Sequence, residues 1–397
     1  MSSVELNKEY EVDITAVAHG GHCIGRVNGQ VVFVRHTAPG ERVRIRITSL
    51  TKGGKIAFAD AIEVLTASEH RITPPCAAAG ACGGCDFMHL DLGYQRELKT
   101  NVLREQLVRL AGLAPDSDLV TGTVVEALTS SETGLGWRSR MEYSTTSQGR
   151  IGMRRHGSHD VVPISQCRIA HPLIATDGVT NVPWAAGTEI RAVATSEGHV
   201  AVLPEASTES PRLTEKVGDF VYHVNARGFW QSHKDAPAVF VETALEMLDL
   251  KSGQHVLDLY AGAGLFTLPL AAAVGAGGRV DAVEGDPIAM KDLRSNLREY
   301  ENVNTHLMSV EKWLGQRRIK NCDMVLLDPS RMGAGKAVIA ELARLRPDKI
   351  VYVACDPAAL GRDIALLREA GYSLTRIRSF DAFPMTHHME TFATFER

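Results

Sequence analysis

Glu284, Asp328 and Cys355 each stand at the end of a short apolar run in the C-terminal half of the chain. Such runs predict buried parallel strands, and ligands bind beyond the carboxyl ends of the strands in sheets of this kind. Carboxylates there can accept hydrogen bonds or protons, and a cysteine can act as a nucleophile once it is deprotonated. A lone cysteine at a strand end is more often inert, so a chemical role for Cys355 depends on its neighbours.

A glycine-rich turn predicts the cofactor site. The segment Val256–Phe266 reads as a strand, a turn with Gly262 and Gly264, and the start of a helix. Glycine lets the backbone approach a ligand where a Cβ would clash, and Glu284, about 20 residues further on, can accept hydrogen bonds from both hydroxyls of an adenosine ribose. A nicotinamide-binding domain would carry a third glycine where Thr267 stands. The Asp-x-Tyr-x-Gly-x-Gly pattern instead resembles motif I of class I S-adenosylmethionine methyltransferases.

Three later segments resemble the motifs of the uridine-5 RNA methyltransferase family. Asp328–Gly333 is similar to the family's Asp-Pro-Pro-Arg-x-Gly, and Ala354–Asp363 is similar to its Ser-Cys-Asn-Pro-x-Thr-x-x-Arg-Asp. Phe380–Glu390 is similar to its terminal Asp-x-Phe-Pro-x-Thr-x-His-x-Glu. The trio is specific, and the resemblance extends over essentially the whole chain. It implies an enzyme, an RNA (uracil-5-)-methyltransferase that uses S-adenosylmethionine.

The resemblance also implies a role for each site residue. Cys355 is the implied nucleophile, which adds to carbon 6 of uracil so that carbon 5 becomes enolate-like and can attack a methyl group. Glu390 is the implied base, which removes the proton from carbon 5. His387 and His388 are expected to shape their loop rather than to titrate. The implied cofactor contacts are Gln231, Tyr260, Gly262, Gly264, Leu265, Glu284 and Asp328.

Three positions depart from the family's pattern. Leu265 stands where close relatives often carry Asn, so only the backbone can contact the cofactor there. Ser330 replaces the second proline of Asp-Pro-Pro-Arg, and Asp356 replaces an asparagine. An amino-group methyltransferase would favour an aromatic residue after Asp-Pro-Pro, and Arg331 argues against that activity.

A second group of cysteines predicts a metal centre. Cys76, Cys82 and Cys85 form a Cys-x5-Cys-Gly-Gly-Cys motif, and Cys167 is the natural fourth ligand. Four thiolates suit an iron–sulfur cluster or a structural zinc ion. Relatives with this spacing carry a [4Fe–4S] cluster, so the resemblance favours the cluster over zinc or unmetallated thiols. The remaining cysteines are predicted to be packing residues: Cys23 and Cys322.

The elements that must position these side chains predict a multidomain α/β protein. Residues 1–66 read as a small TRAM- or OB-like β-barrel that binds RNA, and residues 67–215 as a β-rich domain with the iron–sulfur centre and RNA contacts. Residues 216–397 alternate between helix and strand, which predicts a Rossmann-like methyltransferase domain. A helix over 92–113 has apolar residues at helical spacing and is expected to pack on the catalytic domain.

The first of these domains combines a strand pattern with positive charge. Alternation over Arg42–Ile47 places apolar residues on one face and arginines on the other. A basic barrel face is a platform for nucleic acid, and a solvated strand face is an equal alternative from charge alone. The Val31–Val43 segment resembles the TRAM domain, a small RNA-binding barrel.

Composition limits the class of protein. The chain has 397 residues, 44% hydrophobic and 23% charged, with a net charge of −4, which excludes a histone-like polycation. It lacks a signal peptide and any apolar run long enough to span a bilayer, so we expect a cytoplasmic monomer without membrane association and with reduced cysteines. The expected partner is RNA, with 23S ribosomal RNA first and the T-loop uridine of transfer RNA as the alternative. A non-catalytic RNA-binding protein with a degenerate methyltransferase domain is a third possibility, which the intact motifs disfavour.

Overall fold

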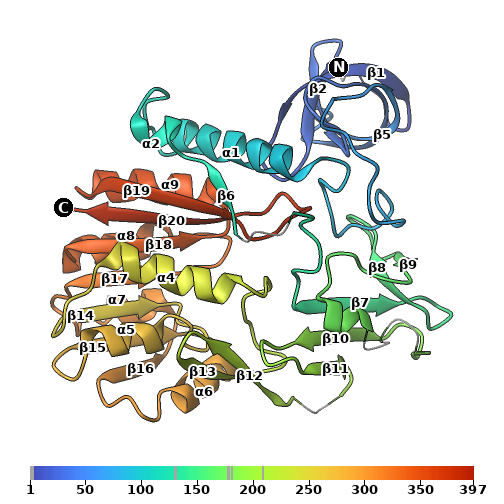
Figure 1. Ribbon diagram of the computed structural model, residues 1–397. Helices are drawn as coiled ribbons and strands as arrows, with labels where there is room; N and C mark the ends of the chain where they lie inside the picture. Colours follow the sequence, from blue (N-terminus) through green and yellow to red (C-terminus); the bar gives the residue numbers. More distant parts are fainter. Residues whose placement is uncertain (1–3, 129–131, 177–178, 180–181, 208–209) are drawn as a thin grey trace.

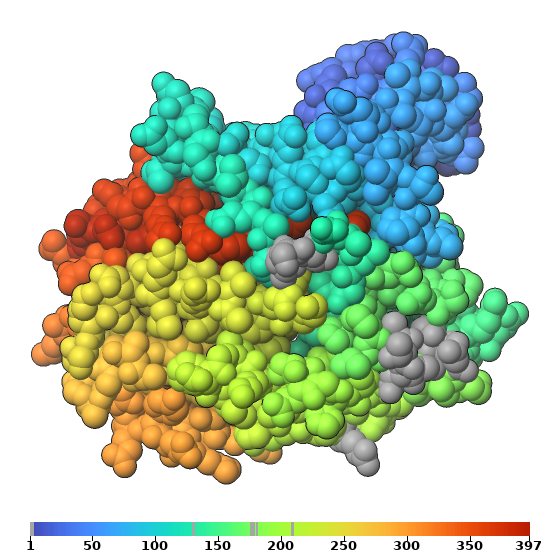
Figure 2. All heavy atoms as spheres, in the orientation of Figure 1, coloured from blue at the N-terminus to red at the C-terminus, as the bar shows by residue number. Residues whose placement is uncertain are grey.

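The computed structural model describes residues 4–128, 132–176, 179, 182–207 and 210–397. An N-terminal barrel, a central antiparallel sheet and a C-terminal mixed sheet with helices are its main parts (Figure 1). The barrel protrudes as a separate lobe from the rest of the molecule (Figure 2).

The N-terminal strands close into a barrel in the order β1-β2-β3-β5-β4. Val43, Ile45 and Ile47 are buried in its interior, which confirms the predicted alternation in the fourth strand. The barrel strands are β1 (Glu9–Val17), β2 (Cys23–Val27), β3 (Gln30–Arg35), β4 (Arg42–Thr51) and β5 (Ile56–Thr66).

The arginines of β4 do point outward, but they do not form an open basic platform. Each is paired with a carboxylate on a neighbouring strand: Arg42 with Glu11 at 3.2 Å, Arg44 with Glu63 at 2.5 Å and Arg46 with Glu9 at 2.7 Å. The sequence pattern of one strand did not show these acidic partners, which lie beside it on β1 and β5, so the outward face of β4 carries charges of both signs.

The central part begins with a long helix, α1 (Leu92–Arg109), which runs from the barrel to the C-terminal domain (Figure 1). It ends earlier than the predicted 113, with Leu110 as its C-cap and Gly112 in the left-handed region at φ +66°. α2 (Asp118–Thr121) and α3 (Pro172–Thr176) are short helices. The central sheet has the order β11-β10-β7-β8-β9 and consists of β7 (Arg140–Thr145), β8 (Ile151–Arg154), β9 (Val161–Pro163), β10 (Glu189–Ala194) and β11 (Val200–Pro204).

The C-terminal sheet has eight strands in the order β16-β15-β14-β17-β18-β20-β19-β6. The first five are parallel, as the predicted doubly wound domain requires, and all of them except the edge strand β16 are largely buried. Its strands are β14 (His255–Leu259), β15 (Arg279–Glu284), β16 (Val303–Leu307), β17 (Met324–Leu327), β18 (Lys349–Ala354), β19 (Ser373–Asp381), β20 (Glu390–Glu396) and β6 (Val125–Ala127).

The accompanying elements of this domain are a hairpin and a series of helices. They are β12 (Arg212–Val217), β13 (Phe220–Asn225), α4 (Ala236–Leu248), α5 (Thr267–Val274), α6 (Pro287–Asn296), α7 (Val310–Gly315), α8 (Gly335–Leu345) and α9 (Pro357–Glu369). Because β6 pairs with β19, a segment from the first third of the chain completes the C-terminal sheet. The predicted boundaries at 66 and 215 stay predictions.

Strand direction brings the site together. β20 runs antiparallel to β18, with Ala354 opposite Thr391, so the first residue of β20 lies at the same sheet edge as the residue that follows β18. Those two residues are Glu390 and Cys355. The carboxyl ends of β14 and β17 open onto this edge as well, as expected where the strand order of an open sheet reverses.

Candidate active site

A cleft of about 880 Å³ runs along this edge of the sheet. Its lining includes both predicted catalytic residues and nearly all of the predicted cofactor contacts: Cys355, Glu390, Gln231, Tyr260, Gly262, Leu265, Glu284 and Asp328. Gly264 is the exception. A Cβ at Gly264 would come within 2.7 Å of Leu293 Cδ1, so this glycine lets the turn pack against α6 rather than facing the cleft.

The cofactor end of the cleft is organised around one carboxylate. Glu284 accepts a hydrogen bond from the Gly262 amide at 2.8 Å and another from the Asp286 amide at 2.6 Å. Gly262 has φ +57° and open space where a Cβ would stand. Leu265 contributes its carbonyl, which accepts from the Tyr222 hydroxyl at 3.0 Å. The turn therefore presents glycine backbone and a fixed acid, a suitable surface for the sugar of an adenosine ligand.

A buried carboxyl lies behind the turn. Asp258 is 1% exposed, and its Oδ2 accepts from the Thr267 hydroxyl at 2.5 Å. Its Oδ1 has no hydrogen-bond partner among the described residues. Burial raises the pKa of Asp258 to about 7. The hydrogen bond from Thr267 opposes this rise, and the charge of Glu284 adds to it.

Cys355 follows β18 and is half-buried at the other end of the cleft. Burial raises the pKa of its thiol to about 12, the charges of Glu390 and Asp328 add to this, and Arg331 opposes it. The next residue, Asp356, caps α9 by accepting from the Ala359 amide at 2.7 Å. The thiol therefore needs a base or a nearby positive charge to lose its proton. The carboxyls of Glu390 and Asp328 and the guanidinium of Arg331 all lie near enough to affect it.

Glu390 is buried at the start of β20. Burial raises its pKa well above the ordinary value, the charge of Asp328 adds to this, and Arg331 opposes it. Burial also raises the pKa of Asp328 to about 7, with a contribution from Asp258. A carboxyl with a raised pKa near neutral pH is suited to accept and release protons.

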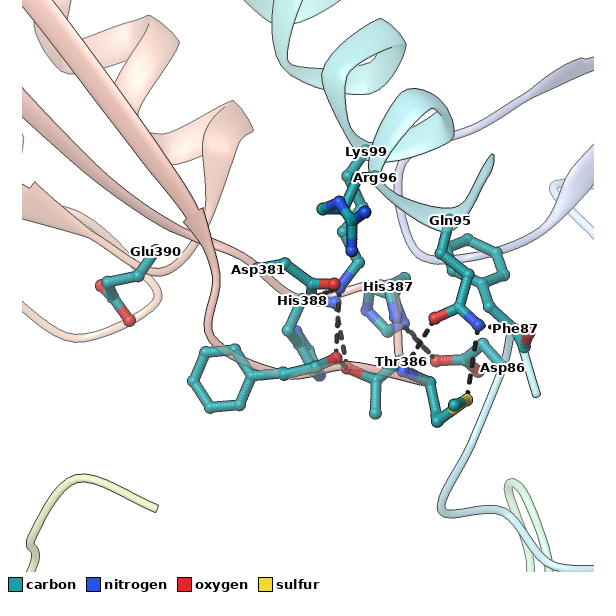
Figure 3. Close-up of polar contacts among 12 residues, drawn as sticks. Asp86, Phe87, Gln95, Arg96, Lys99, Asp381, Thr386, His387, His388 and Glu390 are labelled. Atoms are coloured by element: carbon teal, nitrogen blue, oxygen red, sulfur yellow. Dashed lines mark hydrogen bonds and ion pairs between the residues drawn. The ribbon is translucent and has the colours of Figure 1, made fainter. Parts of the chain in front are cut away.

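The 382–389 loop, which leads into Glu390, is held by helix α1 (Figure 3). Lys99 is fully buried, and its ammonium group donates to Asp381 Oδ1 at 2.5 Å and to the Phe383 carbonyl at 3.1 Å. The Gln95 amide bonds the same loop, since its Oε1 accepts from the Met385 amide at 2.9 Å. These contacts fix the first half of the loop that leads to Glu390.

The segment just before α1 holds the loop from a second side. The Asp86 and Phe87 amides both donate to the Met385 carbonyl at 2.9 Å. The Asp86 carboxylate contacts His387 Nδ1 at 2.6 Å (Figure 3). Burial lowers the pKa of His388 to about 3, with the charges of His387 and Arg331 adding, so this ring stays neutral.

Sequence reasoning missed Lys99, Gln95 and Asp381 as supports of the site. A signal was present, because Lys99 and Gln95 lie on the buried face of α1 together with Leu98 and Val102. A polar side chain on such a face needs a partner. Helical periodicity shows that these polar side chains are buried and need a hydrogen-bond partner, but it does not show which residue that partner is.

The four cysteines of the predicted metal centre line one small cavity: Cys76, Cys82, Cys85 and Cys167. Burial raises the pKa of Cys82, Cys85 and Cys167. Within the described ranges, no three His, Cys, Asp or Glu side chains are grouped closely enough for a single metal ion. Cys23 and Cys322 lie instead in the hydrophobic core.

Comparison with protein families decides the class. A model described as tRNA (uracil-5-)-methyltransferase matches residues 185–397, and a TRAM-domain model matches residues 3–62. The chain belongs to the tRNA (uracil-5-)-methyltransferase family. The sequence-based prediction of an RNA (uracil-5-)-methyltransferase with an N-terminal TRAM domain is thereby confirmed.

Full-length relatives agree with this membership. An uncharacterized RNA methyltransferase of Streptomyces avermitilis is 41% identical, with 98% of this chain and 99% of the relative covered. A 23S rRNA (uracil(1939)-C(5))-methyltransferase of Shewanella sp. (strain MR-4) is 31% identical, with 100% and 97% covered.

A solved structure supports the fold of this family member. The tRNA (uracil-54, C5)-methyltransferase of Pyrococcus abyssi, in complex with S-adenosyl-L-homocysteine, has a TM-score of 0.72 at 21% identity, with 97% of this chain and 99% of that chain covered. The C-terminal domain thus has the fold of S-adenosylmethionine-dependent methyltransferases. Over the described ranges, no helix is both long and apolar enough to cross a membrane.

Proposed function

We propose that this enzyme methylates carbon 5 of a uridine in 23S ribosomal RNA through a covalent adduct between Cys355 and carbon 6 of the base. The observation that carries the proposal is the register of β18 and β20, which brings Cys355 and Glu390 to one sheet edge beside the cofactor turn. A thiol and a carboxyl with raised pKa values in one cleft suit nucleophilic addition followed by proton removal.

The roles follow from the position of each group. When bound, S-adenosylmethionine supplies an electrophilic methyl group. Cys355 gives its proton to solvent, and its sulfur then bonds to carbon 6, which makes carbon 5 nucleophilic toward that methyl group. Arg331 lowers the cost of the thiolate. Glu390 then takes the proton of carbon 5, and the carbon–sulfur bond breaks to release the Cys355 thiolate.

The cofactor contacts belong to the proposal as well. Glu284 would accept from the ribose hydroxyls, and the backbone of Gly262 and Leu265 would line the adenosine. Gln231, Tyr260 and Asp328 line the rest of the same cleft. Asp258 does not line the cleft, and it supports the turn from behind by accepting from the Thr267 hydroxyl.

Substitutions at the reacting centre test the mechanism. Cys355→Ala should abolish methylation and leave cofactor binding intact, whereas Glu390→Gln should accumulate a covalent RNA adduct. Cys322→Ala, which removes a thiol from the core, is the matched control and should keep turnover. Normal turnover in Cys355→Ala would end the mechanism.

The RNA target has its own test. Relatives described as 23S rRNA methyltransferases cover the whole chain, which favours ribosomal RNA over the T-loop uridine of transfer RNA. Mass analysis of RNA from a deletion strain should show loss of one 5-methyluridine in 23S rRNA. Loss from transfer RNA would support the alternative, and loss from neither would support a non-catalytic RNA-binding protein.

We further propose that the four cysteines hold a [4Fe–4S] cluster in a domain spanning 67–215, between the barrel of 1–66 and the catalytic domain of 216–397. All four line one cavity. Four thiolates around one cavity suit a [4Fe–4S] cluster, and a structural zinc ion with sulfurs at about 2.3 Å is the alternative. Anaerobically purified protein should contain iron and show brown absorbance, and Cys167→Ala should lose both while Cys23→Ala keeps them. Stoichiometric zinc would overturn the assignment.

A further inference from the structure

An aromatic patch covers part of the outer face of the barrel. Phe33 on β3 lies opposite Phe58 on β5, and their rings stack with centroids 5.5 Å apart at 26°. His22, just before β2, meets Phe58 edge-on at 5.4 Å and Phe33 at 6.4 Å. We call these three residues the aromatic patch.

The patch points outward. The neighbours of the two phenylalanines along their strands are Val32, Val34, Ala57 and Ala59, all buried inside the barrel at 0–1% exposed. Because successive residues of a strand point to opposite faces, Phe33 and Phe58 face outward, where both remain partly exposed. Two stacked aromatic rings on the outside of a small barrel do not contribute to the packing of its interior.

The patch begins where the catalytic cleft ends. His156, in the turn between β8 and β9, lines the cleft, and its ring lies 6.1 Å from that of His22. The barrel turn next to His22 also contacts the catalytic loop, since a Cβ at Gly21 would lie 3.0 Å from that of His387. A strand of RNA leaving Cys355 along the cleft would therefore reach the aromatic patch.

One exposed arginine beside the patch can contact a nucleic-acid backbone. Arg26 is exposed on the outward side of β2, whereas Arg35, on the outward side of β3, lies 3.8 Å from Asp60 with its side chain 13% exposed. The arginines of β4 are engaged with carboxylates on another part of the barrel. Burial lowers the pKa of His22, and the charge of Arg35 adds to this effect, whereas a hydrogen bond to the Gly20 carbonyl opposes it. The ring is therefore neutral and presents an aromatic surface.

We propose that the aromatic patch is a stacking subsite for an unpaired RNA base that flanks the target uridine. The subsite rests on the proposed function, because it places that uridine at Cys355. Bases stack on aromatic side chains with little regard to sequence, and sequence-specific RNA enzymes use bases displaced from their helix. The patch would hold the strand in register while the target base enters the cleft.

Fluorescent RNA tests the subsite without any methyl transfer. The probe is a ten-nucleotide single-stranded oligouridylate with 2-aminopurine one, two or three positions from its centre, added to the full chain with S-adenosylhomocysteine. One position should be quenched in the wild type. Phe33→Ala and Phe58→Ala should lose that quenching and raise Kd about tenfold. Since stacking involves no ion release, this ratio should not change between low and high salt.

Control variants separate stacking from folding. Phe33→Tyr keeps an aromatic face and should restore quenching, whereas Phe33→Leu keeps barrel packing and should not. Ile62→Ala removes an exposed apolar side chain from the same strand as Phe58 and should bind as the wild type does. Cys355→Ala should also quench normally, so failure of the proposed chemistry would leave this result intact. No quenching in the wild type, or unchanged quenching in Phe33→Ala, would overturn the proposal.

Discussion

The two ends of the cleft are built in different ways. At the cofactor end, the Gly262 amide and the Glu284 carboxylate lie 22 residues apart in one strand–turn–helix–strand unit. At the reacting end, Lys99 and Asp381 lie 282 residues apart, and His19 and Asp356 lie 337 apart. A local motif thus builds the cofactor site, whereas the reacting centre depends on contacts from α1 and the barrel. Substitutions at the two ends should separate cofactor affinity from rate.

The largest effect is expected at Lys99. Lys99→Met leaves the Asp381 carboxylate buried without its cation, and breaking a buried pair costs about 3–5 kcal/mol of unfolding free energy. The loop before Glu390 also loses its bond to the Phe383 carbonyl. Because a displacement of about 1 Å costs about 100-fold in rate, kcat should fall by that amount while the Kd for S-adenosylhomocysteine stays unchanged.

A second readout distinguishes positioning from general destabilisation. If Lys99 acts through Glu390, Lys99→Met should accumulate the covalent RNA adduct on denaturing gels, as Glu390→Gln does. The double variant Lys99→Met with Asp381→Leu should regain stability without regaining rate, since no buried charge is left unpaired. A wild-type kcat in Lys99→Met would show that the reacting centre does not depend on contacts from α1.

The next effect is on the pH profile of the reacting end. Cys355 and Glu390 act in their deprotonated forms, and both have raised pKa values, that of Cys355 being about 12 because of burial and the charges of Glu390 and Asp328. Below such a pKa the reactive form grows with pH. The single-turnover rate at saturating cofactor should therefore rise from pH 6 to 9, by about tenfold per unit. A plateau already at pH 7 would mean that the thiol has lost its proton by then, which contradicts a raised pKa of Cys355.

A smaller effect is expected at the cofactor end. Glu284→Gln keeps the size of the side chain but removes the charge and one of the acceptors that bond the Gly262 and Asp286 amides. Bonds to charged groups contribute about 1.5–3 kcal/mol, so the Kd for S-adenosylhomocysteine should rise at least about tenfold by calorimetry. At saturating S-adenosylmethionine, the kcat of Glu284→Gln should equal that of the wild type. A fall in kcat with unchanged Kd would contradict the separation of the two ends.

The same contrast explains what the sequence could predict. The cofactor end was foreseeable because Val256–Phe266 and Glu284 carry their geometry in local spacing, and the methyltransferase fold follows from the alternation of strands and helices. The reacting pair, Cys355 and Glu390, was named only through resemblance to known motifs. Their proximity depends on the antiparallel insertion of β20 beside β18, which no local pattern encodes.

Contacts between strands that are distant in the sequence explain the other features that the sequence did not reveal. β6 spans only Val125–Ala127, too short for a periodic signal, yet it completes the catalytic sheet beside β19. The arginines of β4 suggested a basic face because their acidic partners lie on other strands. The stacked Phe33 and Phe58 are likewise separated along the chain, and only their strand pairing reveals a patch.

The smallest effect is expected where the barrel meets the nucleophile. His19 Nε2 lies 2.9 Å from Asp356 Oδ2, with the two side chains 40% and 22% exposed. Partly exposed pairs contribute about 0–1 kcal/mol, so His19→Ala should lower kcat by less than about fivefold. Asp356 still caps α9 through the Ala359 amide, which keeps Cys355 in place, and Asp356→Asn retains that acceptor as a control. A loss as large as that of Lys99→Met would instead make the barrel an integral part of the reacting centre.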